Sequence, residues 1–437
     1  MTPRALLVTT NGAGMGHLAR MTAVALAGIR TGTIEPTIMT LSVATPLAAN
    51  MGVPVEYCPS SARRWQPYWA WDAYFRDRLA AILTHGHIDV VMFDGVMPYD
   101  GLLAAMGQFP DVKFAWCRRG FWRSDAKVTR RALDRSRYFD AVIEPGDLAG
   151  DDHGPTSGMD AQTTAPVSLL SEVSVMTRRD AREQLGLDTD ARLLFFSFGS
   201  GLSGDSKALL QEVRDAASAN GWQVVATRPW RAEHEVAGVI YIDRVFPLVR
   251  FIHAFDAVVT SAGYNSVHEY VAASVPTLVV ANSTLVTDDQ SARANGVSQL
   301  GLALAAGSVD DVSSPLTMLL NGWQPPHKPG ACDGSAEIAA ALAGLATTST
   351  RRESNRLGRK LRLLAATGPW LIGPARRLLG KVSRAIPVAH VSVTGDVSAL
   401  ADNSPNTAIE HIADLDPSGG YGHARRELAA RVYPSRL

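Results

Sequence analysis

The sequence predicts an α/β protein made of two doubly wound domains of similar size that face each other across a cleft. Short apolar runs alternate with longer helical patterns, which is typical of parallel sheets covered by helices on both faces. The alternation stops once, in a stretch at 145–166 rich in Gly, Pro, Asp, Ser and Thr, and then restarts. With 437 residues, the chain is also too long for a single compact core.

The individual elements follow in chain order. In the first half a strand at 5–9 leads into a helix at 15–29, and further strands are predicted at 36–41, 89–94 and 112–116. In the second half the predicted elements are strands at 193–198, 223–227, 239–242, 257–260 and 277–280, a helix at 206–220 and a short apolar run at 301–304. The predicted domains are therefore 1–166 and 167–346, followed by an extension at 347–437. Because such sheets bind ligands beyond the carboxyl ends of their strands, the cleft is the expected active site.

Composition excludes several classes of protein. The 42 basic and 42 acidic residues cancel, so the chain offers no broad field for nucleic acid. Three scattered cysteines, odd in number, favour neither a disulfide framework nor a zinc site, and they predict a reducing, cytoplasmic compartment. No apolar run approaches the roughly 20 residues that a membrane-spanning helix needs.

A glycine loop follows the first strand. Gly12, Gly14 and Gly16 alternate with other residues, and His17 comes directly after them. This spacing does not match the dinucleotide-binding fingerprint. It does let the backbone approach an anion at the start of a helix. His17 either faces the cleft or caps a turn, and position alone leaves both readings open.

A second glycine loop, Ser261-Ala-Gly-Tyr-Asn-Ser266, follows the strand at 257–260 and opens a helix. Gly263 permits close approach of a phosphate to the backbone N–H groups of Tyr264 and Asn265. Glu269, almost two turns later, could accept hydrogen bonds from the two hydroxyls of a ribose. The alternative is a solvated surface glutamate.

Two further polar segments follow strands of the second half. Asp288-Asp289-Gln290 suits the hydroxyls of a sugar. Its alternative is an ordinary helix N-cap. Gly199 and Ser200 form a turn after the strand at 193–198 that could also meet phosphate, although such turns are common.

The order of these motifs resembles the GT-B glycosyltransferases, especially the family 28-like branch that contains the peptidoglycan UDP-N-acetylglucosamine transferase. The resemblance covers roughly residues 4–340. It rests on Gly-x-Gly-x-Gly-His, on Ser-Ala-Gly-x-Asn-Ser-x-x-Glu, and on the Asp-Gln pair about twenty residues later. The segment 244–248 also looks like the family segment that reads uracil through its backbone.

The resemblance implies two Rossmann-like domains and an inverting enzyme without cofactor or metal. It would move a sugar from a nucleotide diphosphate donor, expected to be UDP-linked, to an acceptor hydroxyl. Residues assigned to the donor are Gly14, Gly16, Arg178, Gly199, Ser200, Val245, Phe246, Ser261, Gly263, Tyr264, Asn265, Ser266, Glu269, Asp289 and Gln290. Within this set Glu269 would hold the ribose, and Arg178 or its neighbour Arg179 would neutralise the leaving diphosphate.

For the base that deprotonates the acceptor, the resemblance offers His17. Asp94, at the end of the strand 89–94, is either the alternative base or the group that orients His17. The family carries paired glutamines where this chain has Asp289-Gln290, which leaves the donor sugar open. The aromatic stretches 65–71 and 116–123 either stack on sugars or simply pack. Two rival functions are a nucleotide-sugar epimerase of the same fold and a non-catalytic nucleotide-sugar-binding scaffold.

The extension has its own charge pattern. Residues 351–384 contain ten basic side chains and one acidic side chain, a local charge of +9. Part of this segment is expected to form the last helix that crosses back over the first domain. An alternative is that this segment makes weak, peripheral contact with the anionic inner face of the membrane. Beyond 387 the sequence is weakly patterned, which predicts mobility.

Overall fold

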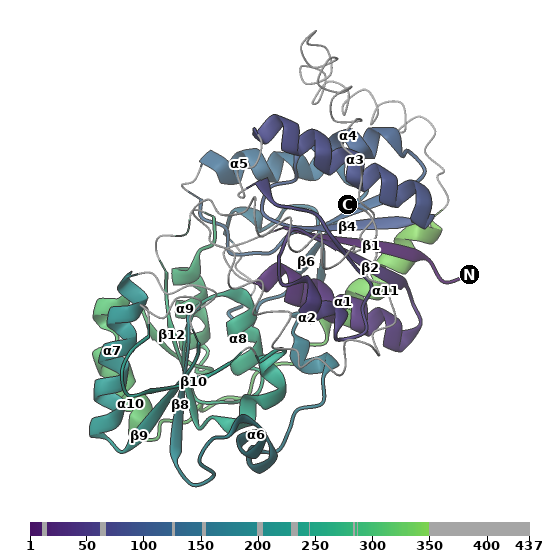
Figure 1. The fold of residues 1–437 in the computed structure, drawn as a ribbon. Coiled ribbons are helices and arrows are strands. Elements are labelled where there is room, and N and C mark those ends of the chain that lie inside the picture. The colour runs from purple at the N-terminus through teal and green to yellow at the C-terminus, as the bar shows by residue number, and fades with distance from the viewer. Residues whose placement is uncertain are drawn as a thin grey trace.

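The protein consists of two α/β units, each built on an all-parallel sheet (Figure 1). The computed structural model describes residues 1–10, 15–61, 67–124, 127–150, 154–198, 204–228, 235–243, 245–282, 285 and 287–348. Within these ranges the first sheet has seven strands and the second has six. The predicted fold class, two facing doubly wound domains, is confirmed.

The first sheet has the order β3-β2-β1-β4-β5-β6-β7. Its strands are β1 (Arg4–Thr9), β2 (Glu35–Thr40), β3 (Val55–Tyr57), β4 (Val90–Asp94), β5 (Lys113–Cys117), β6 (Ala141–Pro145) and β7 (Gln162–Thr164). β1 and β4 are buried almost throughout, because they lie at the centre of the sheet between two helical layers. Thr9 pairs with Asp94, which in turn pairs with Cys117, so the carboxyl ends of β1, β4 and β5 share one edge.

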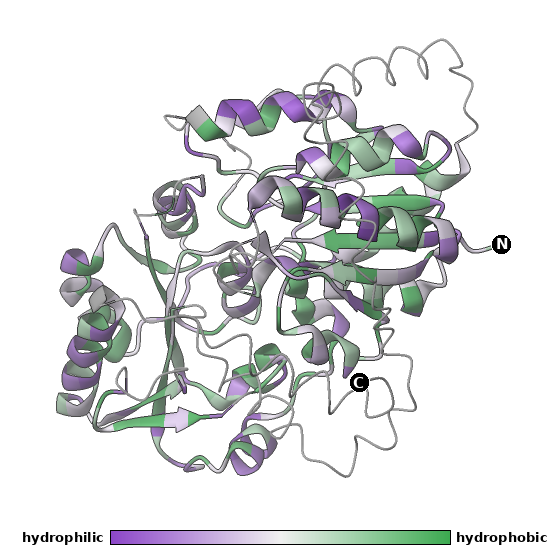
Figure 2. Ribbon diagram, turned by 45° about the horizontal axis from the view of Figure 1, so that its top comes forward, coloured by the Kyte–Doolittle hydropathy of each residue, from purple (hydrophilic) through white to green (hydrophobic). Residues whose placement is uncertain are grey.

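Helices cover both faces of this sheet. One face carries α1 (Gly16–Thr31) and α2 (Thr45–Ala49), and the other carries α3 (Tyr68–Gly86), α4 (Asp100–Gln108) and α5 (Lys127–Leu133), which continues into η2 (Asp134–Tyr138). In Figure 2 the apolar strands run between helices whose polar residues face outward. The segment at 145–166, predicted to be a loop, contains η3 (Gly154–Thr156) and the edge strand β7.

The second sheet has the order β10-β9-β8-β11-β12-β13. Its strands are β8 (Arg192–Ser197), β9 (Trp222–Thr227), β10 (Val239–Ile242), β11 (Ala257–Ser261), β12 (Thr277–Val280) and β13 (Leu304–Ala306). The accompanying helices are η4 (Leu169–Glu172), α6 (Arg178–Leu185), α7 (Gly204–Ala219), η6 (Leu248–Ala254), α8 (Tyr264–Tyr270), α9 (Gln290–Gln299), η7 (Val309–Asp311) and α10 (Ser313–Leu320). β11 at the centre again ends at a glycine loop.

The last described helix, α11 (Gly334–Thr347), returns to the first domain and packs against α1 and β4 to β7. Gly334 stands at the point of return, where a Cβ atom would lie 1.8 Å from the carbonyl oxygen of Ala165. Only glycine fits this close approach. The sequence analysis expected part of 351–384 to form a returning helix, whereas α11 already ends at Thr347. That segment and the membrane contact proposed for it lie outside the described residues.

No helix among the described residues is both long and apolar enough to cross a bilayer.

Candidate active site between the two domains

A buried cluster of three side chains lies at the carboxyl edge of the first sheet. Asp94 ends β4 and is inaccessible to solvent. Its Oδ1 accepts a hydrogen bond from Arg20 at 2.6 Å and lies 3.0 Å from His17 Nδ1, while its Oδ2 accepts from Arg20 Nε at 3.1 Å. His17 and Arg20 are three residues apart, so they share one face of α1. Burial alone would raise the pKa of Asp94, but the charges of Arg20 and His17 hold that pKa at about 2.

This geometry favours one tautomer of His17. Its Nδ1 lies 3.0 Å from Asp94 Oδ1 and 3.3 Å from Arg20 Nη2. Because an ionised carboxylate only accepts hydrogen bonds, the shorter contact assigns the proton to Nδ1. Nε2 is then bare and able to accept a proton. Asp94 itself is a poor base, because its pKa is low and no face of it is exposed. Of the two sequence-based alternatives, the structure arranges Asp94 as the residue that orients His17.

The second glycine loop lies directly opposite this cluster. Asn265 Nδ2 donates to the carbonyl oxygen of Gly16 at 2.8 Å, and the Arg20 guanidinium lies 4.9 Å from the centre of the Tyr264 ring. The start of α1 and the second glycine loop therefore lie in contact. Gly14 lies outside the described residues, as do Gly199 and Ser200.

Tyr264 and His268 of α8 fasten this loop to the first domain. The Tyr264 hydroxyl donates to the carbonyl oxygen of Gly146 at 2.9 Å and accepts from the Val167 N–H at 3.0 Å. His268 Nε2 accepts from the Leu148 N–H at 2.9 Å, so its proton resides on Nδ1. Burial lowers the pKa of His268 and favours this neutral form. The side chain of Tyr264 is thus structural, which leaves only its backbone N–H for a ligand.

Glu269 of α8 has a carboxyl group that the described part of the protein leaves without a partner. Its carboxyl group is partly buried, and no hydrogen bond or ion pair to it occurs among the described residues. Burial raises its pKa to about 7. A carboxyl group without a partner suits the predicted contact with ribose hydroxyls, because both of its oxygens are still available as acceptors.

Asp289 and Gln290, predicted to bind the donor sugar, are already engaged inside the protein. Asp289 Oδ1 accepts from the Ala292 N–H at 3.0 Å and caps α9. Gln290 is buried, and its Oε1 accepts from the Asn282 N–H at 3.1 Å. The N-cap alternative therefore describes Asp289. Gln290 still lies beside the loop, 3.7 Å from the position that a Cβ atom would take on Gly263.

Arg293 of α9 connects both domains beneath these residues. It is completely buried and donates to Asp147 at 2.7 Å, to the carbonyl oxygen of Ala262 at 3.0 Å, and to Asp288 at 3.1 Å. Despite burial, the charge of Arg293 lowers the pKa of Asp147. The charges of Arg119 and Arg293 together lower the pKa of Asp288. The network fixes the glycine loop and the 287–289 segment relative to the first domain.

A short antiparallel bridge closes the two domains over this network. Trp122 pairs with Asp288, the Asp289 N–H donates to the carbonyl oxygen of Phe121 at 2.8 Å, and the Arg123 N–H donates to that of Thr287 at 3.0 Å. We call residues 121–123 and 287–289 the interdomain bridge. Because these bonds join loops of different domains, they describe a closed arrangement.

A narrow crevice lies beside the Asp94 cluster, at the carboxyl edge of the first sheet. It is lined by His17, Arg20, Asp94, Gly95, Val96, Cys117, Arg119 and Trp122. Sequence reasoning missed Arg20, Arg119 and Arg293. The spacing of Arg20 from His17 on a helix could have revealed the first of these. The other two depend on contacts between domains that no local pattern displays.

The structure does not bring Arg178 to this site, so that prediction was wrong. Arg178 donates to Asp256 at 2.9 Å, and Asp256 also accepts from the Leu193 N–H at the start of β8. These contacts belong to the amino edge of the second sheet, whereas Gly263 follows the carboxyl end of β11. Arg179 pairs with Glu183 on the exposed side of α6.

The remaining donor residues stay predictions. Ser261 and Ser266 are half-buried beside Gly263, and Val245 and Phe246 are half-buried ahead of η6. The described side chains of the aromatic stretches differ in burial. Trp71, Trp116 and Trp122 are buried and pack in the core, while Tyr68 and Trp69 are exposed.

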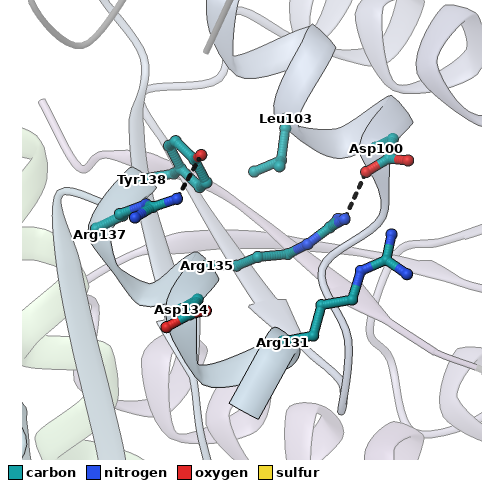
Figure 3. A pocket seen from close by; sticks show the side chains of 7 residues that line it. All are labelled: Asp100, Leu103, Arg131, Asp134, Arg135, Arg137 and Tyr138. Atoms are coloured by element: carbon teal, nitrogen blue, oxygen red, sulfur yellow. Dashed lines mark hydrogen bonds and ion pairs between the residues drawn. The ribbon is translucent and has the colours of Figure 1, made fainter. Parts of the chain in front are cut away.

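A separate cavity of about 190 Å³ opens between α4 and η2 (Figure 3). Its lining residues are Asp100, Leu103, Arg131, Asp134, Arg135, Arg137 and Tyr138. Arg135 is bound to Asp100 at 2.6 Å, and Arg137 donates to the Tyr138 hydroxyl at 3.2 Å. None of these residues was predicted from the sequence to belong to the site.

Two facing parallel α/β domains, with a last helix that returns to the first, constitute the GT-B fold. The sequence matches no protein-family model and no curated protein. Among solved structures, the chain is similar to the glycosyltransferase SnogD from Streptomyces nogalater, with a TM-score of 0.50 and 15% identity over 82% of this chain and 100% of that one.

Two other solved structures share this architecture. A protein from Listeria monocytogenes assigned as a UDP-N-acetylglucosamine 2-epimerase has a TM-score of 0.57 and 12% identity over 80% of this chain and 98% of its own. The spinosyn forosaminyltransferase SpnP has a TM-score of 0.52 and 13% identity over 83% of this chain and 100% of its own. At such identities the likenesses establish the fold and leave the activity to the site itself.

Proposed function

We propose that the protein is an inverting, metal-independent glycosyltransferase that moves a sugar from a nucleotide diphosphate donor, UDP-linked, to an acceptor hydroxyl. The observation that carries this proposal is the His17–Asp94 pair in the crevice, 3.0 Å apart and opposite the Gly263–Glu269 segment. A base oriented by a buried carboxylate on one domain faces a loop and a free carboxyl group suited to a nucleotide on the other.

In this mechanism His17 Nε2 takes the proton of the acceptor hydroxyl. The acceptor oxygen forms a bond to the anomeric carbon as the bond from that carbon to the donor phosphate oxygen breaks. The electron pair of the broken bond leaves with the nucleoside diphosphate, and a single displacement of this kind inverts the anomeric centre. Asp94 keeps its charge and stabilises the imidazolium that forms. Glu269 holds the ribose hydroxyls of the donor.

A thermal-shift screen of nucleotides and nucleotide sugars tests the proposal, because a ligand that binds only the folded state raises the melting temperature. We expect UDP and a UDP-sugar to raise it. We also expect His17→Ala to bind the same nucleotide and lose turnover. Stabilisation by another nucleotide with UDP inert would change the donor, and no stabilisation by any nucleotide would overturn the proposal.

An epimerase of the same fold is the second candidate, favoured by the structural likeness to the Listeria protein. It would act on the donor alone. Incubation with a UDP-sugar and no acceptor separates the two: a new sugar in the products favours the epimerase, and its absence favours transfer.

A further inference from the structure

Arg119 is a cation between the two domains whose charge the protein only partly neutralises. It follows the carboxyl end of β5, and 14% of its side chain is exposed. Its guanidinium reaches Thr287 Oγ1 at 3.4 Å and Asp288 Oδ2 at 3.7 Å. Both contacts are longer than the roughly 2.7–2.9 Å of a good charged hydrogen bond. Its Nε–H is buried and finds no acceptor among the described residues.

Its neighbour Arg118 shows what a structural arginine looks like in this loop. Arg118 is completely buried, and it donates to Glu144 at 3.1 Å and to Ser136 at 3.1 Å within the first domain. The charge of Arg118 is therefore neutralised by Glu144 within the first domain. Arg119 points the other way, into the crevice that His17 and Asp94 also line.

The nearest counter-charge to Arg119 is shared with another cation. Arg293 binds Asp288 Oδ1 at 3.1 Å, closer than Arg119 binds Oδ2. Burial lowers the pKa of Arg119, and the positive charges of Arg293 and Arg20 lower it further, against the effect of Asp288. A desolvated guanidinium in this situation gains strongly from an additional anion, because its unused N–H donors can then be satisfied.

A chain of contacts leads from Arg119 to the predicted phosphate loop. Gln290 Nε2 lies 3.4 Å from Asp288 Oδ2 and 3.7 Å from the Cβ position of Gly263. Arg119 contacts the same Asp288 carboxylate, so Asp288 and Gln290 connect its guanidinium to the loop. Arg119 therefore lies on the side of the first domain from which an anion at this loop could be approached.

We propose that Arg119 binds the diphosphate of the nucleotide donor from the side of the first domain and stabilises the negative charge on the oxygen that leaves the anomeric carbon. This inference rests on the proposed function. Arg119 stays protonated throughout and donates hydrogen bonds, while the acceptor proton goes to His17. Arg119 takes the role that the sequence analysis assigned to Arg178. Because Arg119 also contacts Thr287 and Asp288 of the second domain, its binding of the diphosphate would link departure of the diphosphate to closure of the domains.

Calorimetric titration of the full-length protein with UDP and with uridine tests this role. We expect Arg119→Gln to weaken UDP binding roughly 10- to 100-fold, the usual range for loss of a charged hydrogen bond, with uridine affinity unchanged. Arg178→Gln, which removes the same charge at the opposite edge of the second sheet, is the matched control and should bind both ligands like the wild type.

Equal UDP affinity in the wild type and Arg119→Gln would overturn the inference and leave the proposed function standing. Parallel losses of UDP and uridine affinity would also overturn it, because they would assign Arg119 to domain closure. If Arg119→Gln does not fold, Arg119→Lys keeps the charge without the planar fork, and it should lose several-fold in UDP affinity alone. If the wild type binds dTDP and not UDP, dTDP and thymidine replace the pair. If it binds neither nucleotide, both proposals fail.

Discussion

The two domains contribute two faces to the candidate site, and these faces differ in how their carboxyl groups are satisfied. On the first domain, Asp94 is saturated by Arg20 and His17 at 2.6–3.1 Å and is closed to solvent. On the second domain, Glu269 has a carboxyl group with no partner among the described residues and a pKa raised to about 7. The carboxylate on the first face has its hydrogen bonds without a ligand, and the carboxyl group on the second face retains unsatisfied acceptors.

This difference indicates a division of labour. Pre-organised groups keep their orientation during a reaction, and they need no rearrangement as charge develops. Unsatisfied groups raise the free energy of the empty protein, and they recover it when a ligand supplies the missing hydrogen bonds. The Asp94 cluster is therefore suited to proton transfer, and the Glu269 carboxyl group is suited to binding a ligand. Variants that exchange these properties should separate stability from affinity.

Breaking the saturated face should have the largest effect on stability. In Asp94→Asn, Arg20 remains buried without its carboxylate. Removing one partner of a buried ion pair typically costs about 3–5 kcal/mol in the free energy of unfolding. We expect a loss of this size at pH 7, measured by urea denaturation. Asp89→Asn is the matched control, because Asp89 is exposed just before the same strand and its carboxylate accepts from the Arg4 N–H. A loss no greater than that of the control would contradict the buried-pair argument.

The same pair predicts a pH dependence. The pKa of Asp94 falls from 3.8 to about 2 on folding, so the unfolded chain takes up this proton first as the solution is acidified. The stability that the carboxylate contributes is present above the unfolded pKa and is lost as pH falls through the folded pKa. The gap between wild type and Asp94→Asn should therefore narrow between pH 4 and pH 2.

The saturated face also shows how far sequence reasoning reaches. His17 was proposed as the base from the resemblance and from its place after the first glycine loop, and Asp94 was proposed because it ends a central strand. Parallel neighbouring strands bring these two parts of the chain together. The pairing of Thr9 with Asp94 provides that proximity. Arg178 failed the same reasoning, because being near the start of a domain in the chain does not say which edge of the sheet a residue reaches.

The fold was predictable where buried elements produce a clear hydrophobic pattern in the sequence. The central strands are continuous apolar runs, and their positions were predicted within a residue or two. β3 and β7 were missed, because each is three residues long at the edge of the sheet and carries polar residues such as Glu56 and Gln162. The return of α11 was also missed, because an apolar helix does not reveal which sheet it will cover.

Neutralising Glu269 should change stability less than Asp94→Asn does, and it should raise stability rather than lower it. The folded-state pKa of Glu269 is raised from 4.5 to about 7 by burial, so its protonated form favours the folded state. The stability that protonated Glu269 contributes is fully present below its unfolded pKa and is lost as pH rises through its folded pKa. Glu269→Gln cannot ionise, and we expect its melting temperature to exceed that of the wild type at pH 8 but not at pH 4.5.

The affinity of Glu269→Gln for uridine separates the electrostatic role from the binding role. A glutamine keeps one acceptor oxygen and loses the charge, so binding should weaken by roughly tenfold. Glu183→Gln, exposed on α6 and paired with Arg179, is the control for both measurements. Stabilisation at pH 8 with unchanged uridine affinity would preserve the pKa argument and remove the contact with ribose.

The smallest expected effect concerns Asp289, where the two readings of one residue predict different outcomes. As the N-cap of α9, it accepts from the Ala292 N–H, and loss of such a cap costs about 1 kcal/mol. Asp289→Ala should lose this amount in urea denaturation, and Asp289→Ser should recover most of it, because serine caps helices equally well. If capping is its whole role, Asp289→Ser also restores the affinity for a UDP-sugar relative to UDP. If the carboxylate also binds the donor sugar, serine restores stability but not that ratio. The comparison thereby decides whether Asp289 belongs with the saturated groups that shape the site or with the free groups that meet the donor.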